Sequence, residues 1–322
     1  MSKPRILLTR RWPEMSEREL RDNFDVTFDA GDTPLSPDAL IAAMRDHDGI
    51  ACTVTDRLDA DVLEAASTGQ CRIIANFGVG VNHIDVAAAT RHGMVVTNTP
   101  GVLTDATADI ALTLMLMTAR RAGEGERELR TGNWAGWRPT HLLGRELTGK
   151  TLGIIGMGRI GRATAQRAAL GFGMKIVFYN RSRLDDTGPF EATQLPTVRD
   201  VCAAADIISL HCPGGEETWH ILNAEAMAAM KPDALVINTA RGDVIDEEAL
   251  AEALEEGRIG GAGLDVFQGE PVINPRLLAA PNTVLLPHLG SATLETRNAM
   301  GMTVVRNLSA FFAGRDVPDP VT

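Results

Sequence analysis

Three residues in the second half of the chain could together bind a small acid and move a proton. Arg241, Glu270 and His288 each follow a short apolar run typical of a strand. A planar guanidinium can hold a carboxylate through two parallel hydrogen bonds, and an imidazole can exchange a proton near neutral pH. A carboxylate beside the imidazole would orient the ring and favour its charged form. We therefore expect a site in which Arg241 binds an acid, His288 transfers the proton and Glu270 is the partner of His288.

Each of these residues has an ordinary explanation when it is taken alone. Arg241 or Glu270 would most often be a solvated loop charge, and His288 a helix cap or a core residue. Their shared position favours a site, because ligands of doubly wound sheets bind beyond the carboxyl ends of the strands. Residues that follow three such strands can meet at that edge of the sheet.

A glycine-rich segment follows another strand-like run. Gly156, Gly158 and Gly161 have the spacing of the strand-to-helix turn of dinucleotide-binding domains, and an Ala-rich helical run follows them. The first glycine permits the tight turn, the second lets a diphosphate approach the backbone, and the third lets helix and strand pack closely. The N–H groups of Arg159 and Ile160 would bind the diphosphate at the helix N-terminus. The alternative is a glycine-rich turn within a core sheet.

The residues after the next predicted strand indicate which dinucleotide is preferred. An NAD site normally has an acidic residue there, which accepts a hydrogen bond from the ribose 2′-hydroxyl. This chain has Asn180 instead, followed by Arg181, Ser182 and Arg183. The neutral side chain removes a charge that would repel a 2′-phosphate, and the residues after it are donors to such a group. We expect NADPH to be the preferred cofactor and NADH a second one.

Strand-like and helix-like runs alternate along most of the chain, which predicts parallel sheets with helices on both faces. The predicted strands are Arg5–Thr9, Val26–Phe28, Gly49–Val54, Arg72–Asn76, Met94–Thr97, Leu152–Ile155, Lys175–Tyr179, Ile207–Leu210, Leu235–Asn238, Gly261–Asp265 and Val284–Leu286. The predicted helices are Ser16–Asn23, Ser36–Arg45, Asp59–Ala66, His83–His92, Thr104–Arg121, Arg159–Leu170, Val198–Ala204, Ala224–Met230, Asp246–Glu256 and Thr293–Phe312. The segment from Arg121 to Pro139 is too irregular to assign.

The last predicted helix has no strand set of its own, so we expect it to pack on the N-terminal sheet. The fold is therefore predicted to be α/β, with two doubly wound parallel-sheet domains. A Rossmann dinucleotide-binding domain, residues 101–290, would be inserted into a flavodoxin-like substrate domain, residues 1–100 and 291–322.

Composition excludes several classes of partner. The net charge of -11 argues against nucleic acid or an anionic membrane as a partner, because both require a basic surface. No apolar stretch at the N-terminus is long enough for a signal peptide or a membrane span. The four cysteines are scattered in or beside apolar runs, which is typical of reduced structural thiols and not of metal ligands. We expect a cytoplasmic protein with no metal site.

The chain resembles the D-isomer-specific 2-hydroxyacid dehydrogenase family over nearly its whole length. The likeness is most specific at residues 238–242 (NTARG), 265–271 (DVFQGEP) and 287–291 (PHLGS). The resemblance implies an enzyme that reduces a 2-oxo acid to the D-hydroxy acid with a nicotinamide cofactor. It also implies that Arg241 binds and polarises the substrate, that His288 is the acid/base and that Glu270 is its partner. The family has the inserted domain arrangement expected above.

Further site residues follow from the same resemblance. Val79 and Gly80 match the family's substrate loop, where backbone N–H groups could hold a carboxylate in a nest. Leu103, Trp134 and Trp137 would shape the substrate pocket, and Asp265 would hold the carboxamide of the cofactor. The residues expected to touch the dinucleotide are Thr107, Gly156, Gly158, Arg159, Ile160, Gly161, Asn180, Arg181, Ser182, His211, Cys212, Pro213, Thr218, Thr239, Ala240, Arg241, Asp265, His288 and Gly290.

Within the family, residues 99–109 and 134–137 are most similar to glyoxylate/hydroxypyruvate reductases. In such enzymes a Trp at the position of Trp137 can reach the partner subunit's site, so the resemblance implies a homodimer; ordinary core or interface packing is the alternative. Two other functions stay open, a reductase for larger 2-oxo acids and a dinucleotide-sensing binding protein similar to corepressors of this fold. We expect no regulatory domain after residue 322, which argues against a long-form phosphoglycerate dehydrogenase and leaves a short form open. Glu270 in place of Gln argues against a formate dehydrogenase.

Overall fold

The chain divides into two compact units, each with its own parallel sheet. The computed structural model describes residues 2–28 and 31–321. Unit 1 comprises Met1–Leu103 and Ala292–Thr322, and unit 2 comprises Thr104–Ser291. The sequence placed the corresponding limits at residues 101 and 290. The predicted architecture of two doubly wound α/β domains, one inserted into the other, is confirmed.

Unit 1 has a five-stranded sheet of order β2-β1-β3-β4-β5, which is the flavodoxin-like order. All its neighbouring strands are parallel. Its elements are β1 (Arg5–Leu8), α1 (Glu14–Asn23), β2 (Asp25–Phe28), α2 (Pro37–Asp46), β3 (Gly49–Cys52), α3 (Ala60–Ala66), β4 (Ile73–Asn76), α4 (Val86–Arg91), β5 (Val95–Thr97) and α12 (Leu294–Phe312).

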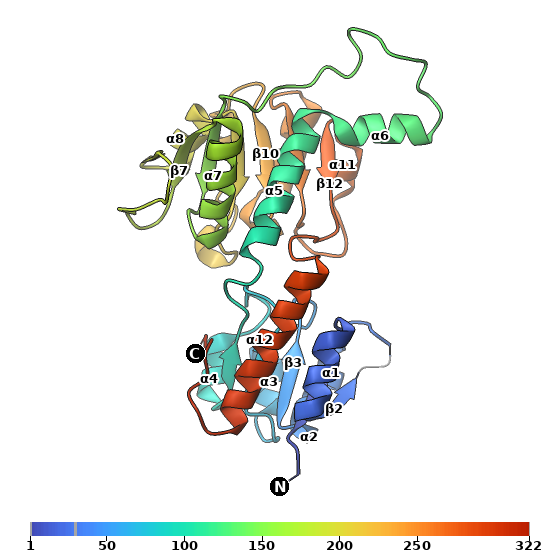
Figure 1. The fold of residues 1–322 in the computed structure, drawn as a ribbon, viewed down its shortest axis with the longest axis vertical. Coiled ribbons are helices and arrows are strands. Elements are labelled where there is room, and N and C mark those ends of the chain that lie inside the picture. Colours follow the sequence, from blue (N-terminus) through green and yellow to red (C-terminus); the bar gives the residue numbers. More distant parts are fainter. Residues whose placement is uncertain (1, 29–30, 322) are drawn as a thin grey trace. The chain divides into compact units, whose positions relative to one another are not determined.

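Helices cover both faces of this sheet (Figure 1). One core joins the sheet to α2, α3 and α4, and a second joins it to α1 and α12. The return of α12 to the N-terminal sheet, which its lack of companion strands predicted, is therefore confirmed. Helix starts follow local chemistry, since the side chain of Ser36 accepts a hydrogen bond from Ala39 N at 3.2 Å at the start of α2.

Unit 2 has a seven-stranded sheet of order β12-β11-β10-β9-β6-β7-β8, again all parallel. Its elements are α5 (Thr104–Ala119), α6 (Ala122–Arg130), β6 (Thr151–Ile155), α7 (Arg159–Phe172), β7 (Lys175–Tyr179), β8 (Ala192–Gln194), α8 (Val198–Ala204), β9 (Ile207–Leu210), η1 (Glu216–Thr218), α9 (Ala224–Ala228), β10 (Leu235–Asn238), η2 (Gly242–Val244), α10 (Glu247–Glu255), β11 (Gly261–Leu264), α11 (Pro275–Ala279) and β12 (Thr283–Leu285).

The two faces of the second sheet carry different helices. Helices α5 and α7 lie side by side on one face (Figure 1), and one apolar core joins them to the sheet. Helices α8 to α11 share the other core. The topological switch lies between β9 and β6, where the strand order reverses. A doubly wound sheet binds its ligand at that point, beyond the carboxyl ends of the strands.

Two α-helices and one strand differ from the sequence expectation, as do the two short 3-10 helices η1 and η2. Helix α6 forms within the segment left unassigned, and β8 and α11 were not predicted. Helix α6 buries only Gly123 and therefore shows no apolar stripe, but ion pairs such as Arg121–Glu124 (2.6 Å) line it. The edge strand β8 has the sequence Ala-Thr-Gln and no apolar run to reveal it.

All four cysteines are free and buried, as the sequence predicted. The described residues contain no group of His, Cys, Asp or Glu side chains that could hold a metal ion. None of the described helices is both long enough and apolar enough to cross a bilayer.

Candidate active site

Arg241, Glu270 and His288 follow three neighbouring strands of unit 2. Arg241 comes after β10, Glu270 after β11 and His288 after β12. These strands are adjacent and parallel, so their carboxyl ends share one edge of the sheet. The fold therefore assembles the side chains that the sequence singled out, although about fifty residues of chain separate the first from the last.

His288 and Glu270 form a hydrogen-bonded pair. The Nδ1 atom of His288 lies 2.9 Å from Oε2 of Glu270, and the other oxygen of Glu270 accepts a hydrogen bond from Phe267 N at 2.9 Å. Burial opposes ionisation of Glu270, but the hydrogen bond and the charge of His288, with the Phe267 N–H, lower its pKa below the ordinary value. With Nδ1 facing a carboxylate, Nε2 is the imidazole atom left to meet a substrate.

A buried carboxylate holds the loop that carries His288. The two oxygens of Asp265 accept hydrogen bonds from Leu289 N at 2.6 Å and Gly290 N at 2.7 Å. His288 itself has a φ of +56°, in the left-handed region that non-glycine residues seldom adopt. Strained backbone of this kind persists when its surroundings hold it in place. Asp265 supplies that restraint, and burial raises its pKa. Its contact with the cofactor carboxamide stays a prediction.

Arg241 is a partly buried cation without an ion-pair partner among the described residues. Its Nη1 donates one hydrogen bond, to Ala240 O at 2.7 Å, and it forms no ion pair with any residue in 2–28 or 31–321. Burial lowers the pKa of its guanidinium, although Glu270 and Asp243 lie near enough to oppose that effect. A partly desolvated cation that forms no ion pair is stabilised when an anion binds beside it, so this arrangement fits a site that is completed by an anionic ligand.

The turn that carries Arg241 is built by Asn238. The Asn238 amide donates to Arg241 O at 2.7 Å and its oxygen accepts from Ala240 N at 3.0 Å. Gly242 is required next, because a Cβ there would lie 1.9 Å from the backbone carbon of Phe267. Asp243, which the sequence analysis did not single out, accepts a hydrogen bond from Gly215 N at 2.9 Å and so connects this turn to the loop after β9.

The glycine-rich turn after β6 has the geometry that a dinucleotide requires. Gly156 has a φ of +95°, and a Cβ on Gly161 would lie 2.3 Å from Gly156 O. Gly158 is the N-cap of α7, and within the described chain no atom lies within 4 Å of a Cβ built there. The first N–H groups of α7, from Arg159 and Ile160, have no intrahelical acceptor. The open space and free donors fit a diphosphate at the helix N-terminus.

The loop after β7 is ordered by an amide from the edge strand. Gln194 on β8 donates to Ser182 O at 3.1 Å and accepts from Leu184 N at 3.0 Å. Asn180 donates to Ser182 O at 3.1 Å. Arg181 is paired with Glu217 on η1, a residue that the sequence analysis did not notice. Only the tertiary structure shows that Arg181 already has an anionic partner.

Residues expected near the nicotinamide line the carboxyl ends of β9 and β10. Ser209 lies 2.9 Å from Nε2 of His211, and burial lowers the pKa of His211 to about 3, so this imidazole is neutral. Burial raises the pKa of the Cys212 thiol to about 12, so it is not a nucleophile at neutral pH. Thr218 donates to Pro213 O at 2.6 Å and shapes its own loop.

Two further hydroxyls fall among the predicted cofactor residues. Thr107 on α5 is buried and donates to Gly290 O at 3.2 Å, behind the loop of His288. The Thr239 hydroxyl is buried and has no hydrogen-bond partner among the described residues, so it can accept or donate one bond to a ligand.

The predicted substrate loop of unit 1 presents unpaired N–H groups. Asn76 donates to Gly78 O at 3.1 Å and Gly80 O at 3.0 Å, and Asn98 donates to Val79 O at 2.8 Å. Their carbonyl groups are thus held, whereas the N–H groups of Val79 and Gly80 have no acceptor within the described part of the chain. These donors fit the prediction that the loop binds a carboxylate, which stays a prediction.

Two residues expected at the substrate pocket differ in exposure. Leu103 is buried, whereas the Trp137 side chain is 81% exposed, which excludes packing in the core of its own chain. Trp134, Leu129 and Leu143 on the same segment are also more than half exposed. So many large apolar side chains exposed on one segment are unusual for a monomeric soluble protein.

Comparison with known proteins identifies the family. Residues 112–290 match the model of the D-isomer specific 2-hydroxyacid dehydrogenase, NAD binding domain. The chain is 43% identical to the glyoxylate reductase of Thermococcus litoralis over 99% of this chain and 97% of that protein. The chain belongs to this family.

Solved structures agree with that assignment. The NADPH-dependent glyoxylate/hydroxypyruvate reductase of Sinorhizobium meliloti, solved with NADP and malonate, has a TM-score of 0.88 and 38% identity. The likeness covers 100% of this chain and 97% of that one. The protein is thus an NAD(P)-dependent 2-hydroxyacid dehydrogenase, and unit 2 contains the nicotinamide dinucleotide-binding domain.

Proposed function

We propose that this dehydrogenase reduces glyoxylate and hydroxypyruvate to glycolate and D-glycerate, with NADPH as the preferred cofactor. The observation that carries the proposal is the partly buried Arg241, a cation without an ion-pair partner in the described chain, beside the His288–Glu270 pair. A small 2-oxo acid supplies the missing anion and a carbonyl oxygen that needs a proton. The names of the Thermococcus litoralis and Sinorhizobium meliloti relatives support this substrate class.

Each residue then has one task. The nicotinamide supplies the hydride when it is bound. Arg241 binds the carboxylate and stabilises negative charge on the oxo oxygen, a stabilisation that grows toward the transition state. His288 donates a proton from Nε2 to that oxygen while its Nδ1 stays hydrogen-bonded to Glu270. Glu270, ionised because its pKa is lowered, favours the charged imidazole that makes this donation possible.

The preference for NADPH rests on the loop after β7. Asn180 is neutral where an acidic residue would repel a 2′-phosphate, and Arg181 and Ser182 are its prospective donors. The glycine turn from Gly156 to Gly161 and the start of α7 would bind the diphosphate.

We also propose a homodimer in the cytoplasm. The exposed Trp134, Trp137, Leu129 and Leu143 suit a subunit interface, because large apolar groups on one segment are covered in most soluble proteins. Trp137 would reach the site of the partner subunit. Sedimentation of the wild type and of Trp137→Ser, with the KM of each, tests both statements: a monomeric wild type contradicts the first, and an unchanged KM contradicts the second.

The deciding experiment follows nicotinamide absorbance with glyoxylate, hydroxypyruvate and phenylpyruvate, each with NADPH and with NADH. Fast NADPH oxidation with the two small acids supports the proposal. Faster turnover of phenylpyruvate would instead indicate a reductase for larger 2-oxo acids. Faster use of NADH would contradict the cofactor preference alone. No turnover with any pair would favour a dinucleotide-sensing binding protein.

A further inference from the structure

An ion pair joins two loops that flank the glycine turn. Arg181 follows β7 and Glu217 lies on η1, after β9, and their side chains are in contact. In the sheet, β6 lies between these two strands, and its carboxyl end leads into Gly156. The pair therefore links the loops on either side of the crevice in which doubly wound sheets bind a dinucleotide.

Both backbones that carry the pair are held in place. Glu217 belongs to a turn in which the Thr218 hydroxyl donates a hydrogen bond to Pro213 O at 2.6 Å. In the same turn, Gly215 N donates a hydrogen bond to the Asp243 carboxylate at 2.9 Å. The Arg181 loop is fastened by Gln194. The side chains themselves stay solvated, with Arg181 82% exposed and Glu217 77% exposed. The contact is thus a weak, exposed ion pair between two ordered loops. An anion that binds the guanidinium more strongly can replace Glu217.

We propose that Glu217 sets how strongly the enzyme distinguishes NADPH from NADH. The inference rests on the proposed binding of a 2′-phosphate by Arg181. Glu217 occupies the same guanidinium, so a 2′-phosphate must displace this carboxylate and then lie near its negative charge. A dinucleotide with a free 2′-hydroxyl competes for no cation and is affected less. Glu217 therefore lowers the affinity for NADPH selectively.

The neighbouring charged residues, Arg183 and Glu216, take no part in this ion pair. Arg183 is paired with Asp185 at 3.6 Å on its own loop. Glu216, the neighbour of Glu217 on the same turn, forms no ion pair within the described residues and provides a matched control. The two carboxylates differ in sequence by one position but only Glu217 reaches Arg181.

The test measures nucleotide binding, without turnover. Titration calorimetry compares adenosine 2′,5′-bisphosphate with 5′-AMP for the wild type, Glu217→Gln and Glu216→Gln. Because an exposed ion pair contributes little, we expect Glu217→Gln to bind the bisphosphate roughly three- to fivefold more tightly, with less than about a twofold change for 5′-AMP. Glu216→Gln should stay within about twofold of the wild type for both nucleotides.

A double variant isolates the role of Arg181. In the Arg181→Ala background, Glu217→Gln should lose most of its effect on the bisphosphate, since no guanidinium is left to release. Equal tightening of both nucleotides, or the same result from Glu216→Gln, would overturn the inference. If the wild type prefers NADH in turnover but Glu217→Gln still tightens the bisphosphate selectively, the proposed cofactor preference fails and the role of Glu217 stands.

Discussion

Oε2 of Glu270 lies 2.9 Å from Nδ1 of His288, so the carboxylate contacts the ring nitrogen opposite to the one offered to substrate. The two residues come from loops after neighbouring strands, β11 and β12. Such a pair both orients the imidazole and favours its charged form. In the proposed mechanism, the proton that reduction requires therefore depends on a residue that does not touch the substrate.

Glu270→Gln should move the pH dependence of reduction. Gln keeps a hydrogen-bonding group but removes the anion, so the charged imidazole loses stabilisation and the activity fades at lower pH. We expect the alkaline limb of kcat/KM to shift down by about one pH unit. Profiles of both proteins over the same pH range measure this. An unchanged alkaline limb would remove Glu270 from its assigned role.

Arg241→Met should separate activity from stability. We expect kcat/KM to fall roughly 100- to 1000-fold, through both KM and kcat, because the guanidinium binds substrate and stabilises the transition state. The thermal midpoint should stay equal or rise, since the variant removes a partly buried cation without an ion-pair partner in the described chain. Activity assays and thermal denaturation of the same samples check the pair of outcomes. A strongly lowered midpoint would assign Arg241 a structural role.

Gly158→Ala and Gly161→Ala form a matched pair on the diphosphate turn. A methyl group at Gly158 meets open space, so the fold should be unaffected while the affinity for NADPH falls about tenfold or more. At Gly161 it would meet Gly156 O at 2.3 Å, so that variant should also lose about 1–3 kcal/mol of stability. Fluorescence titration with NADPH and urea unfolding distinguish them. Equal losses of stability would contradict the assigned geometry.

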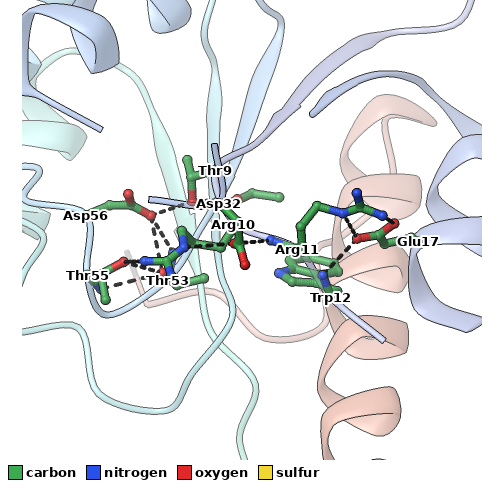
Figure 2. Close-up of polar contacts among 10 residues, drawn as sticks. Thr9, Arg10, Arg11, Trp12, Glu17, Asp32, Thr53, Thr55 and Asp56 are labelled. Atoms are coloured by element: carbon green, nitrogen blue, oxygen red, sulfur yellow. Dashed lines mark hydrogen bonds and ion pairs between the residues drawn. The ribbon is translucent and has the colours of Figure 1, made fainter. Parts of the chain in front are cut away.

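Asp56 in unit 1 should make stability depend on pH. Burial raises its pKa, although the Thr9 hydroxyl and Thr53 N donate hydrogen bonds to it (Figure 2). The folded chain thus holds this proton to higher pH than the unfolded chain. The free energy of unfolding therefore falls as the pH rises from the unfolded pKa through the folded pKa, and is level above it.

Asp56→Asn removes this dependence, because the amide does not ionise. Relative to the wild type, the variant should be more stable at about pH 7 than at about pH 4, because only the wild type loses stability as Asp56 ionises. Urea unfolding at the two pH values gives the difference. A constant difference between the proteins would show that Asp56 has the same pKa in both states.

Much of this protein could be predicted from local sequence. The dinucleotide turn after β6 could be predicted from its glycine spacing alone. Each glycine is required by the local geometry of one strand-turn-helix unit. The alternation of strands and helices gave the fold class, since the two periodicities are local properties of the chain. Arg241, Glu270 and His288 could be grouped because parallel strands bring their carboxyl ends to one edge.

The tertiary structure decided which side chains hold these groups. Three contacts join segments that are separated in sequence. Asp265 accepts hydrogen bonds from the His288 loop, Gln194 donates one to Asn180 O, and Glu217 forms an ion pair with Arg181. Such contacts depend on strand order and loop conformation, which no local pattern encodes. Helix α6 was missed for a related reason: without a core to bury it has no apolar stripe, and ion pairs along its surface stabilise it instead. Local sequence thus determined the elements and the chemistry, and long-range packing determined the electrostatic partners of that chemistry.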